Sequence, residues 1–94
     1  MIAVEELEYR RGVARIVLRM DGTDTLGACK LDLCLIDECG EPHYASGVLR
    51  FDETVASMRL DVDAIPPGRC DGYLLIRCSN GRFELPTVSL EVDG

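Results

Sequence analysis

Five cysteines and a single histidine, His43, are the side chains of this 94-residue sequence best suited to chemistry. A tetrahedral zinc site usually takes its ligands in pairs roughly two to four residues apart. The spacings Cys29-x4-Cys34-x4-Cys39 and Cys70-x7-Cys78 contain no C-x-x-C and do not supply two such pairs. We therefore predict no metal site and expect the cysteines to serve mainly as small apolar core residues, a role that free cysteine often has.

The sequence also contains few residues that could form a catalytic site. A serine or cysteine nucleophile needs a positioned base, and only His43 is present, in a predicted turn with Cys39. No phosphate-binding or dinucleotide-binding glycine motif occurs, so we predict no cofactor and no catalytic residue. The segment Asp21-Gly22-Thr23-Asp24, with Asp71, could hold calcium weakly, but it lacks the spacing of an EF-hand loop and is predicted as a turn.

Charge and hydropathy exclude several classes of partner. Asp and Glu number 17 against 10 Lys and Arg, a net charge of −7, which argues against nucleic acid or an anionic membrane as a partner. No apolar run reaches the roughly 18 residues of a membrane span. No signal peptide is recognisable, so a cytoplasmic location is expected if the chain is complete. The length predicts one domain, residues 1–94.

Alternation of apolar and polar residues predicts strands throughout, although the first segment, Ile2–Tyr9, would also fit a short helical turn. Turn signals separate them roughly every eight to twelve residues, as in a β-sandwich. The last strand contains Pro86, which predicts a sheet edge or a bulge. The expected strands are Ile2–Tyr9, Gly12–Asp21, Cys29–Glu38, Gly47–Asp52, Met58–Ile65, Gly68–Cys78 and Arg82–Val92. We predict an all-β, antiparallel sandwich of about seven strands.

A proline-rich corner gives this pattern a family resemblance. The motif is Leu60-x-Val62-x-x-Ile65-Pro66-Pro67-Gly68-x-Cys70. It resembles the corner of immunoglobulin-like and fibronectin type III-like sandwiches, many of which carry tyrosine where Cys70 stands. The resemblance implies an immunoglobulin-like β-sandwich, a fold that hosts unrelated functions.

In a sandwich of this order, the strands Cys29–Glu38 and Gly68–Cys78 are neighbours, and their register decides the cysteine pairing. Pairing Asp32 with Arg77 is preferred to pairing Lys30 with Arg77, because opposite charges across strands are favourable. That register makes Cys39–Cys70 the better disulfide candidate and Cys29–Cys78 the weaker one. Without a secretion signal, five reduced thiols are favoured over either bond.

The same register gathers Cys34, Ile36, Tyr73 and Leu75 on the outward sheet face, with Val48 nearby. Antiparallel sheets usually expose polar residues there, so we predict a protein interface, used by another domain or by a second copy, rather than chance scatter. The alternatives are a carbohydrate-binding or calcium-stabilised module accessory to a larger enzyme, and a small cysteine-based metal or redox protein. The absence of Trp and the presence of three Tyr disfavour the sugar module.

Overall fold

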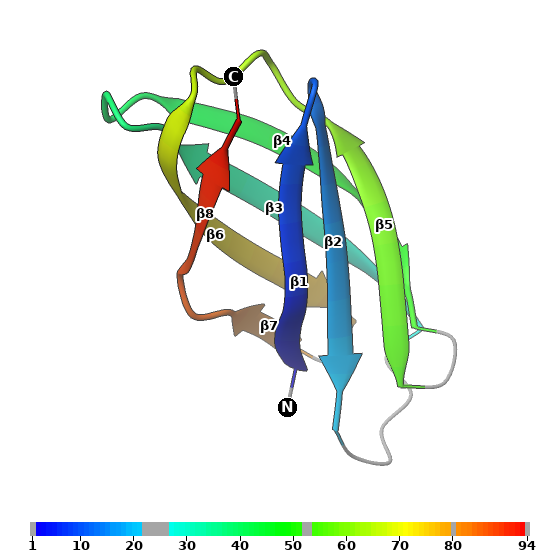
Figure 1. Cartoon of the computed structure of the whole chain (residues 1–94). Helices are drawn as coiled ribbons and strands as arrows, with labels where there is room; N and C mark the ends of the chain where they lie inside the picture. The colour runs from blue at the N-terminus through cyan, green and yellow to red at the C-terminus, as the bar shows by residue number, and fades with distance from the viewer. Residues whose placement is uncertain (1, 22–26, 52–53, 80, 94) are drawn as a thin grey trace.

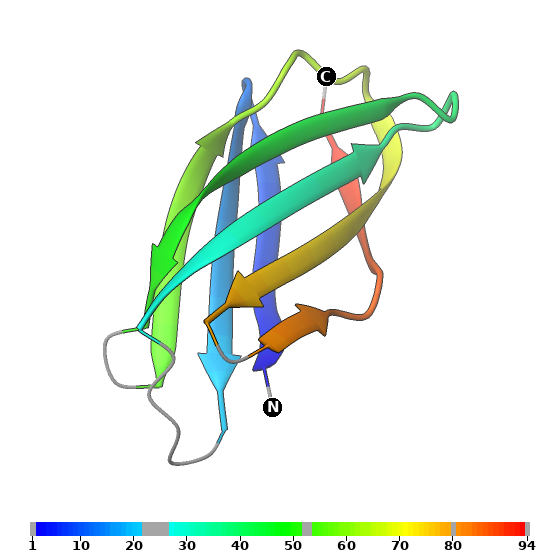
Figure 2. The ribbon, with the colours of Figure 1, turned by 180° about the vertical axis from the view of Figure 1, so that it is seen from behind.

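Eight strands form two antiparallel sheets in the computed structural model, which describes residues 2–21, 27–51, 54–79 and 81–93. The smaller sheet has the order β1-β2-β5 and the larger β4-β3-β6-β7, with β8 also paired to β6 (Figures 1 and 2). The strands are β1 (Ile2–Arg10), β2 (Val13–Met20), β3 (Ala28–Ile36), β4 (Pro42–Arg50), β5 (Val55–Asp61), β6 (Gly68–Cys78), β7 (Gly81–Glu84) and β8 (Val88–Val92). No helix of the described residues is long and apolar enough to cross a membrane.

Period-two alternation places the core between the sheets. Successive side chains of a strand point to opposite faces, and the predicted inward faces of β2, β3 and β6 are the buried ones. The largest fully buried side chains are Ile16, Leu18, Leu31, Leu33, Leu35, Cys70 and Ile76. The antiparallel all-β prediction is confirmed, whereas the count is eight strands instead of seven.

Pro86 accounts for the additional strand. β8 pairs with the first part of β6 and β7 with its last part, so the two are halves of one interrupted edge strand. Between them, the Leu85 N–H donates to the Leu74 carbonyl at 3.0 Å. Proline has no N–H to donate to a ladder, and the predicted strand Arg82–Val92 accordingly divides at that residue.

The predicted β3–β6 register is wrong. Lys30 lies opposite Arg77, and Asp32 lies opposite Leu75. The like-charge pair is tolerated because Arg77 reaches diagonally to Asp32, with 2.6 Å between its Nη2 and the Asp32 Oδ2. Diagonal neighbours on a sheet face lie within reach of long side chains, so the attraction that favoured the other register is obtained here as well.

This register also changes the disulfide assignment. Cys29 and Cys78 face each other with 4.6 Å between their Cα atoms and form a disulfide, while Cys34, Cys39 and Cys70 are free. The preferred Cys39–Cys70 bond and the expectation of five thiols are therefore both wrong. Cys39 is exposed in the turn after β3, whereas Cys70 is 1% exposed in the core.

The proline-rich corner is held by a tyrosine from another strand. The Tyr9 hydroxyl donates to the Asp63 carbonyl at 2.9 Å and accepts from the Ile65 N–H at 3.1 Å. Tyr9 is on β1, so these two hydrogen bonds connect the smaller sheet to the segment that leads into β6. A tyrosine therefore contacts this corner, although Cys70 stands at the position where many members of the family have their tyrosine.

Candidate functional site

The outer face of the larger sheet is a grid of side chains set by the two registers of β3. One row crosses β4, β3 and β6 and consists of Tyr44, Cys34 and Tyr73. The next row contains Ser46, Asp32 and Leu75, with Glu84 of β7 beyond Leu75. The apolar residues of this outer face therefore lie next to one another on neighbouring strands and are not scattered over the sheet.

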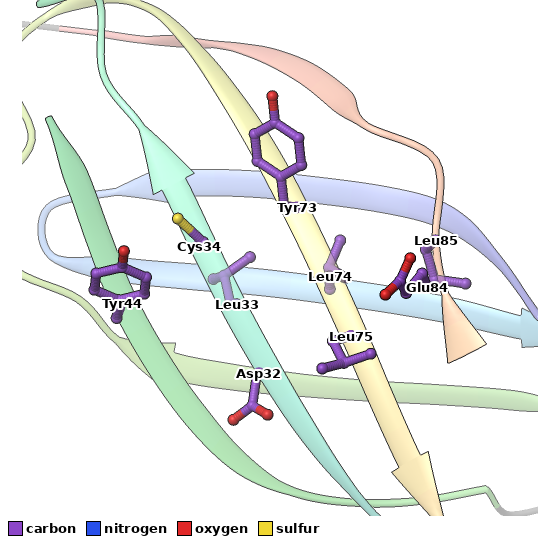
Figure 3. A pocket seen from close by; sticks show the side chains of 9 residues that line it. All are labelled: Asp32, Leu33, Cys34, Tyr44, Tyr73, Leu74, Leu75, Glu84 and Leu85. Atoms are coloured by element: carbon purple, nitrogen blue, oxygen red, sulfur yellow. The ribbon is translucent and has the colours of Figure 1, made fainter. Parts of the chain in front are cut away.

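An open groove of about 320 Å³ runs across these rows. Figure 3 shows Tyr44 at one side and Tyr73 at another, with Cys34 between them. Tyr44 is 72% exposed and Tyr73 44% exposed, so both rings present apolar area together with a hydroxyl group. The residues that line the groove are Asp32, Leu33, Cys34, Tyr44, Tyr73, Leu74, Leu75, Glu84 and Leu85.

The charged groups at the groove are paired. Asp32 contacts Arg77 as described, and Glu84 accepts from Arg82 at 2.9 Å. Both pairs are solvated, and such surface ion pairs contribute little to stability, typically about 0–1 kcal/mol. Their carboxylates and guanidinium groups instead give the apolar groove a polar margin.

The Cys34 thiol at the groove is not activated. Burial raises its pKa, and a hydrogen bond with the Tyr44 side chain opposes that effect only in part. The thiolate is the nucleophilic form of cysteine, so a raised pKa keeps Cys34 a protonated, weakly polar contact. Burial likewise raises the pKa of Cys70, with the Asp37 charge acting in the same direction.

Three of the four predicted interface residues, Cys34, Tyr73 and Leu75, line this groove. Ile36 lies on the same face in another row, between Pro42 and Asp71, and is half-buried. Tyr44 was missed because the predicted strand in this region began at Gly47, whereas β4 begins at Pro42. The exposure of the side chains alternates from Pro42 to Arg50 in the structure, and proline is tolerated as the first residue of a strand.

A second group of polar residues closes the turn between β3 and β4. Asp37 is 7% exposed and accepts hydrogen bonds from the N–H groups of Cys39 and Glu41, at 2.9 and 3.0 Å. Its other oxygen lies 2.9 Å from His43 Nε2. The His43 hydrogen bond, followed by that of the Glu41 N–H, lowers the pKa of Asp37. All these hydrogen bonds join residues in or next to the turn between β3 and β4. The side chain of His43 is therefore paired with Asp37 and not with Cys39.

In the described part of the chain, no group of three or more His, Cys, Asp or Glu side chains is placed so that it could hold a metal ion. The proposed calcium loop falls largely on residues 22–26, outside the described residues. Comparisons with protein-family models, with curated proteins and with solved structures gave no match.

Proposed function

We propose that the chain is a non-catalytic protein-interaction domain with an immunoglobulin-like or fibronectin type III-like sandwich. The strand order supports the fold part of this proposal. A three-stranded sheet β1-β2-β5 opposes a sheet in which β3 and β6 are central, and the proline-rich corner leads into β6. Because a fold of this kind hosts many activities, the functional part rests on the groove.

The observation that carries the proposal is the row Tyr44–Cys34–Tyr73. Two exposed aromatic rings flank an apolar groove, and ion pairs lie at its margin. Protein interfaces have this organisation, with an apolar, aromatic centre and a polar rim. The docking partner is another protein domain, and the tyrosine rings supply contact area at a low cost in conformational entropy.

The test compares two charged substitutions on opposite sheets. Tyr73→Glu places a charge in the groove, and Ser57→Glu places one on the exposed face of β5 as a matched control. We expect both variants to retain the circular dichroism spectrum and the unfolding midpoint of the wild type. A partner captured from cells of the source organism should bind Tyr73→Glu at least about tenfold more weakly, the effect of losing a central aromatic contact.

A result in which Tyr73→Glu and Ser57→Glu bind the same partners as the wild type, with equal affinity, would refute the proposal. Leu75→Glu provides a second perturbation of the same groove, from the neighbouring row. It should weaken the same complex, because Leu75 lines the groove without sharing a row with Tyr73. A partner lost from only one of the two groove variants would contradict docking across the whole groove.

A carbohydrate ligand is the second candidate for this groove. The two exposed tyrosine rings offer stacking surfaces, and the Asp32 and Glu84 carboxylates lie beside them as hydrogen-bond acceptors. Pockets that bind small molecules combine apolar walls with a few polar groups in this way. Titration with a panel of oligosaccharides, followed by tyrosine fluorescence, would reveal such binding, and Tyr44→Ala should abolish it.

A further inference from the structure

β4 is the outermost strand at one edge of the larger sheet (Figure 2). It pairs with β3 from Pro42 to Arg50 in one unbroken register. Among the described residues, β3 is the only strand that pairs with it. A strand at a sheet edge has a row of N–H and C=O groups directed away from its neighbour, so β4 offers a continuous backbone template on its free side.

The other edges carry features that discourage such pairing. β1 has a bulge between Val4 and Glu6, β5 carries Arg59 and Asp61 on its surface, and Pro86 interrupts the β7–β8 edge. Bulges, charged residues and proline are the usual means of protecting an edge strand. The stretch from His43 to Leu49 has no Asp, Glu, Lys or Arg and no bulge.

The inner side of β4 is fixed by close packing. Gly47 faces β5, and a Cβ there would lie 2.8 Å from Leu60 Cδ2 and 2.9 Å from Met58 Cε. The absence of a side chain allows β5 to pack directly against the β4 backbone. The inner face of β4 is therefore packed against β5 at its centre. Its outward residues, Tyr44 and Val48, are each 72% exposed.

From these features we infer that β4 pairs antiparallel with β4 of a second copy of this chain. A two-fold axis at Ser46, the middle residue of Pro42–Arg50, pairs the uncharged stretch from His43 to Leu49 of one copy with the same stretch of the other. Such an axis makes the contact self-complementary, as a closed dimer requires. Tyr44 of each copy then lies opposite Val48 of the other, an aromatic pair with a β-branched residue, which is favourable across strands.

Charge at the ends of β4 favours the same arrangement. Arg50 ends the strand and Glu41 immediately precedes it. Antiparallel pairing about Ser46 places Arg50 opposite the second copy's Pro42 and keeps the Arg50 residues of the two copies at opposite ends of the paired strands. A parallel arrangement would instead bring like charges together at each end, which is unfavourable.

This pairing extends the proposed binding face without depending on it. The two larger sheets become one continuous sheet, with a groove in each copy and the exposed Tyr44 and Val48 side chains at the junction. Tyr73 and Leu75 lie on β6, two strands away from the edge, and take no part in the pairing. Dimerisation and docking at the groove can therefore be tested with different variants.

The test is the mass in solution, measured by size-exclusion chromatography with light scattering over a dilution series. The wild type should approach about twice the monomer mass of 10.4 kDa. Val48→Lys should raise the dimer dissociation constant by about tenfold or more, because a charge enters both symmetric pairs with Tyr44. Val48→Thr, which stays β-branched and uncharged, and Tyr73→Glu should both remain dimeric.

Hydrogen exchange supplies a reading specific to edge pairing. On concentrating the wild type, alternate amides of β4 should slow, because every second N–H points to the free edge. A wild type that is monomeric at all concentrations, or a Val48→Lys variant that associates like the wild type, would overturn the inference. A dimer broken by Tyr73→Glu and not by Val48→Lys would also overturn it, while leaving groove docking in place.

Discussion

The disulfide between Cys29 and Cys78 gives this small domain a stability that depends on redox conditions. It closes a loop with a sequence separation of 49 residues. In the chain-entropy treatment of crosslinks, a loop of that length contributes about 4 kcal/mol to the free energy of unfolding at 25 °C. Domains of this size are stable by only about 5–15 kcal/mol, so reduction should remove a large part of the total.

Urea unfolding with and without a phosphine reductant measures this contribution. The reduced protein should lose about 4 kcal/mol, which corresponds to a melting temperature lower by roughly 15–30 °C for a domain of this size. Cys29→Ala/Cys78→Ala is the matched control, and the reductant should not change its unfolding curve. Cys34→Ala should keep the full response, because Cys34 is free.

Thiol counting provides an independent check. Alkylation in denaturant without reductant should label three cysteines, Cys34, Cys39 and Cys70, and leave Cys29 and Cys78 unlabelled. Five labelled thiols, or a reductant effect below about 1 kcal/mol against the 2–4 kcal/mol typical of disulfides, would refute the reasoning. An equal effect of reductant on the double alanine variant would show that the response has another source.

Two further substitutions test how the loops are held. Tyr9→Phe removes both hydrogen bonds to the proline-rich corner and should cost about 1–2 kcal/mol in urea unfolding, whereas Tyr73→Phe on the exposed face should change little; equal effects would contradict the assigned role of Tyr9. The pKa of Asp37 is lowered in the folded state, so its stabilising effect should be complete above about pH 4, the ordinary Asp value, and be lost as the pH falls through the lower folded value. Asp37→Asn should flatten that acid-side decline in urea unfolding, and an unchanged pH profile would refute this.

Local patterns in the sequence were sufficient to place most of the strands and their buried faces, although β4 spans Pro42–Arg50 where Gly47–Asp52 was predicted. Side chains alternate along a strand whatever its neighbours are, so the buried residues of β2, β3 and β6 and the outward position of Tyr73 and Leu75 followed from period two alone. Pro86 identified an interrupted edge for an equally local reason, because the residue lacks a backbone donor. These features depend on one segment at a time.

Features that depend on two distant segments were predicted less well. The β3–β6 register was predicted from the attraction between Arg77 and Asp32. Arg77 reaches Asp32 diagonally, and a rule that considers only directly opposed residues does not take such a diagonal contact into account. The disulfide assignment depended on the register and failed with it. The Tyr9 contact with Ile65 joins residues 56 positions apart, and Tyr44 meets Cys34 only because β4 begins at Pro42. Pairing between strands is settled by the packing of the whole sandwich, since alternative registers differ locally by only a few tenths to about 1 kcal/mol per pair.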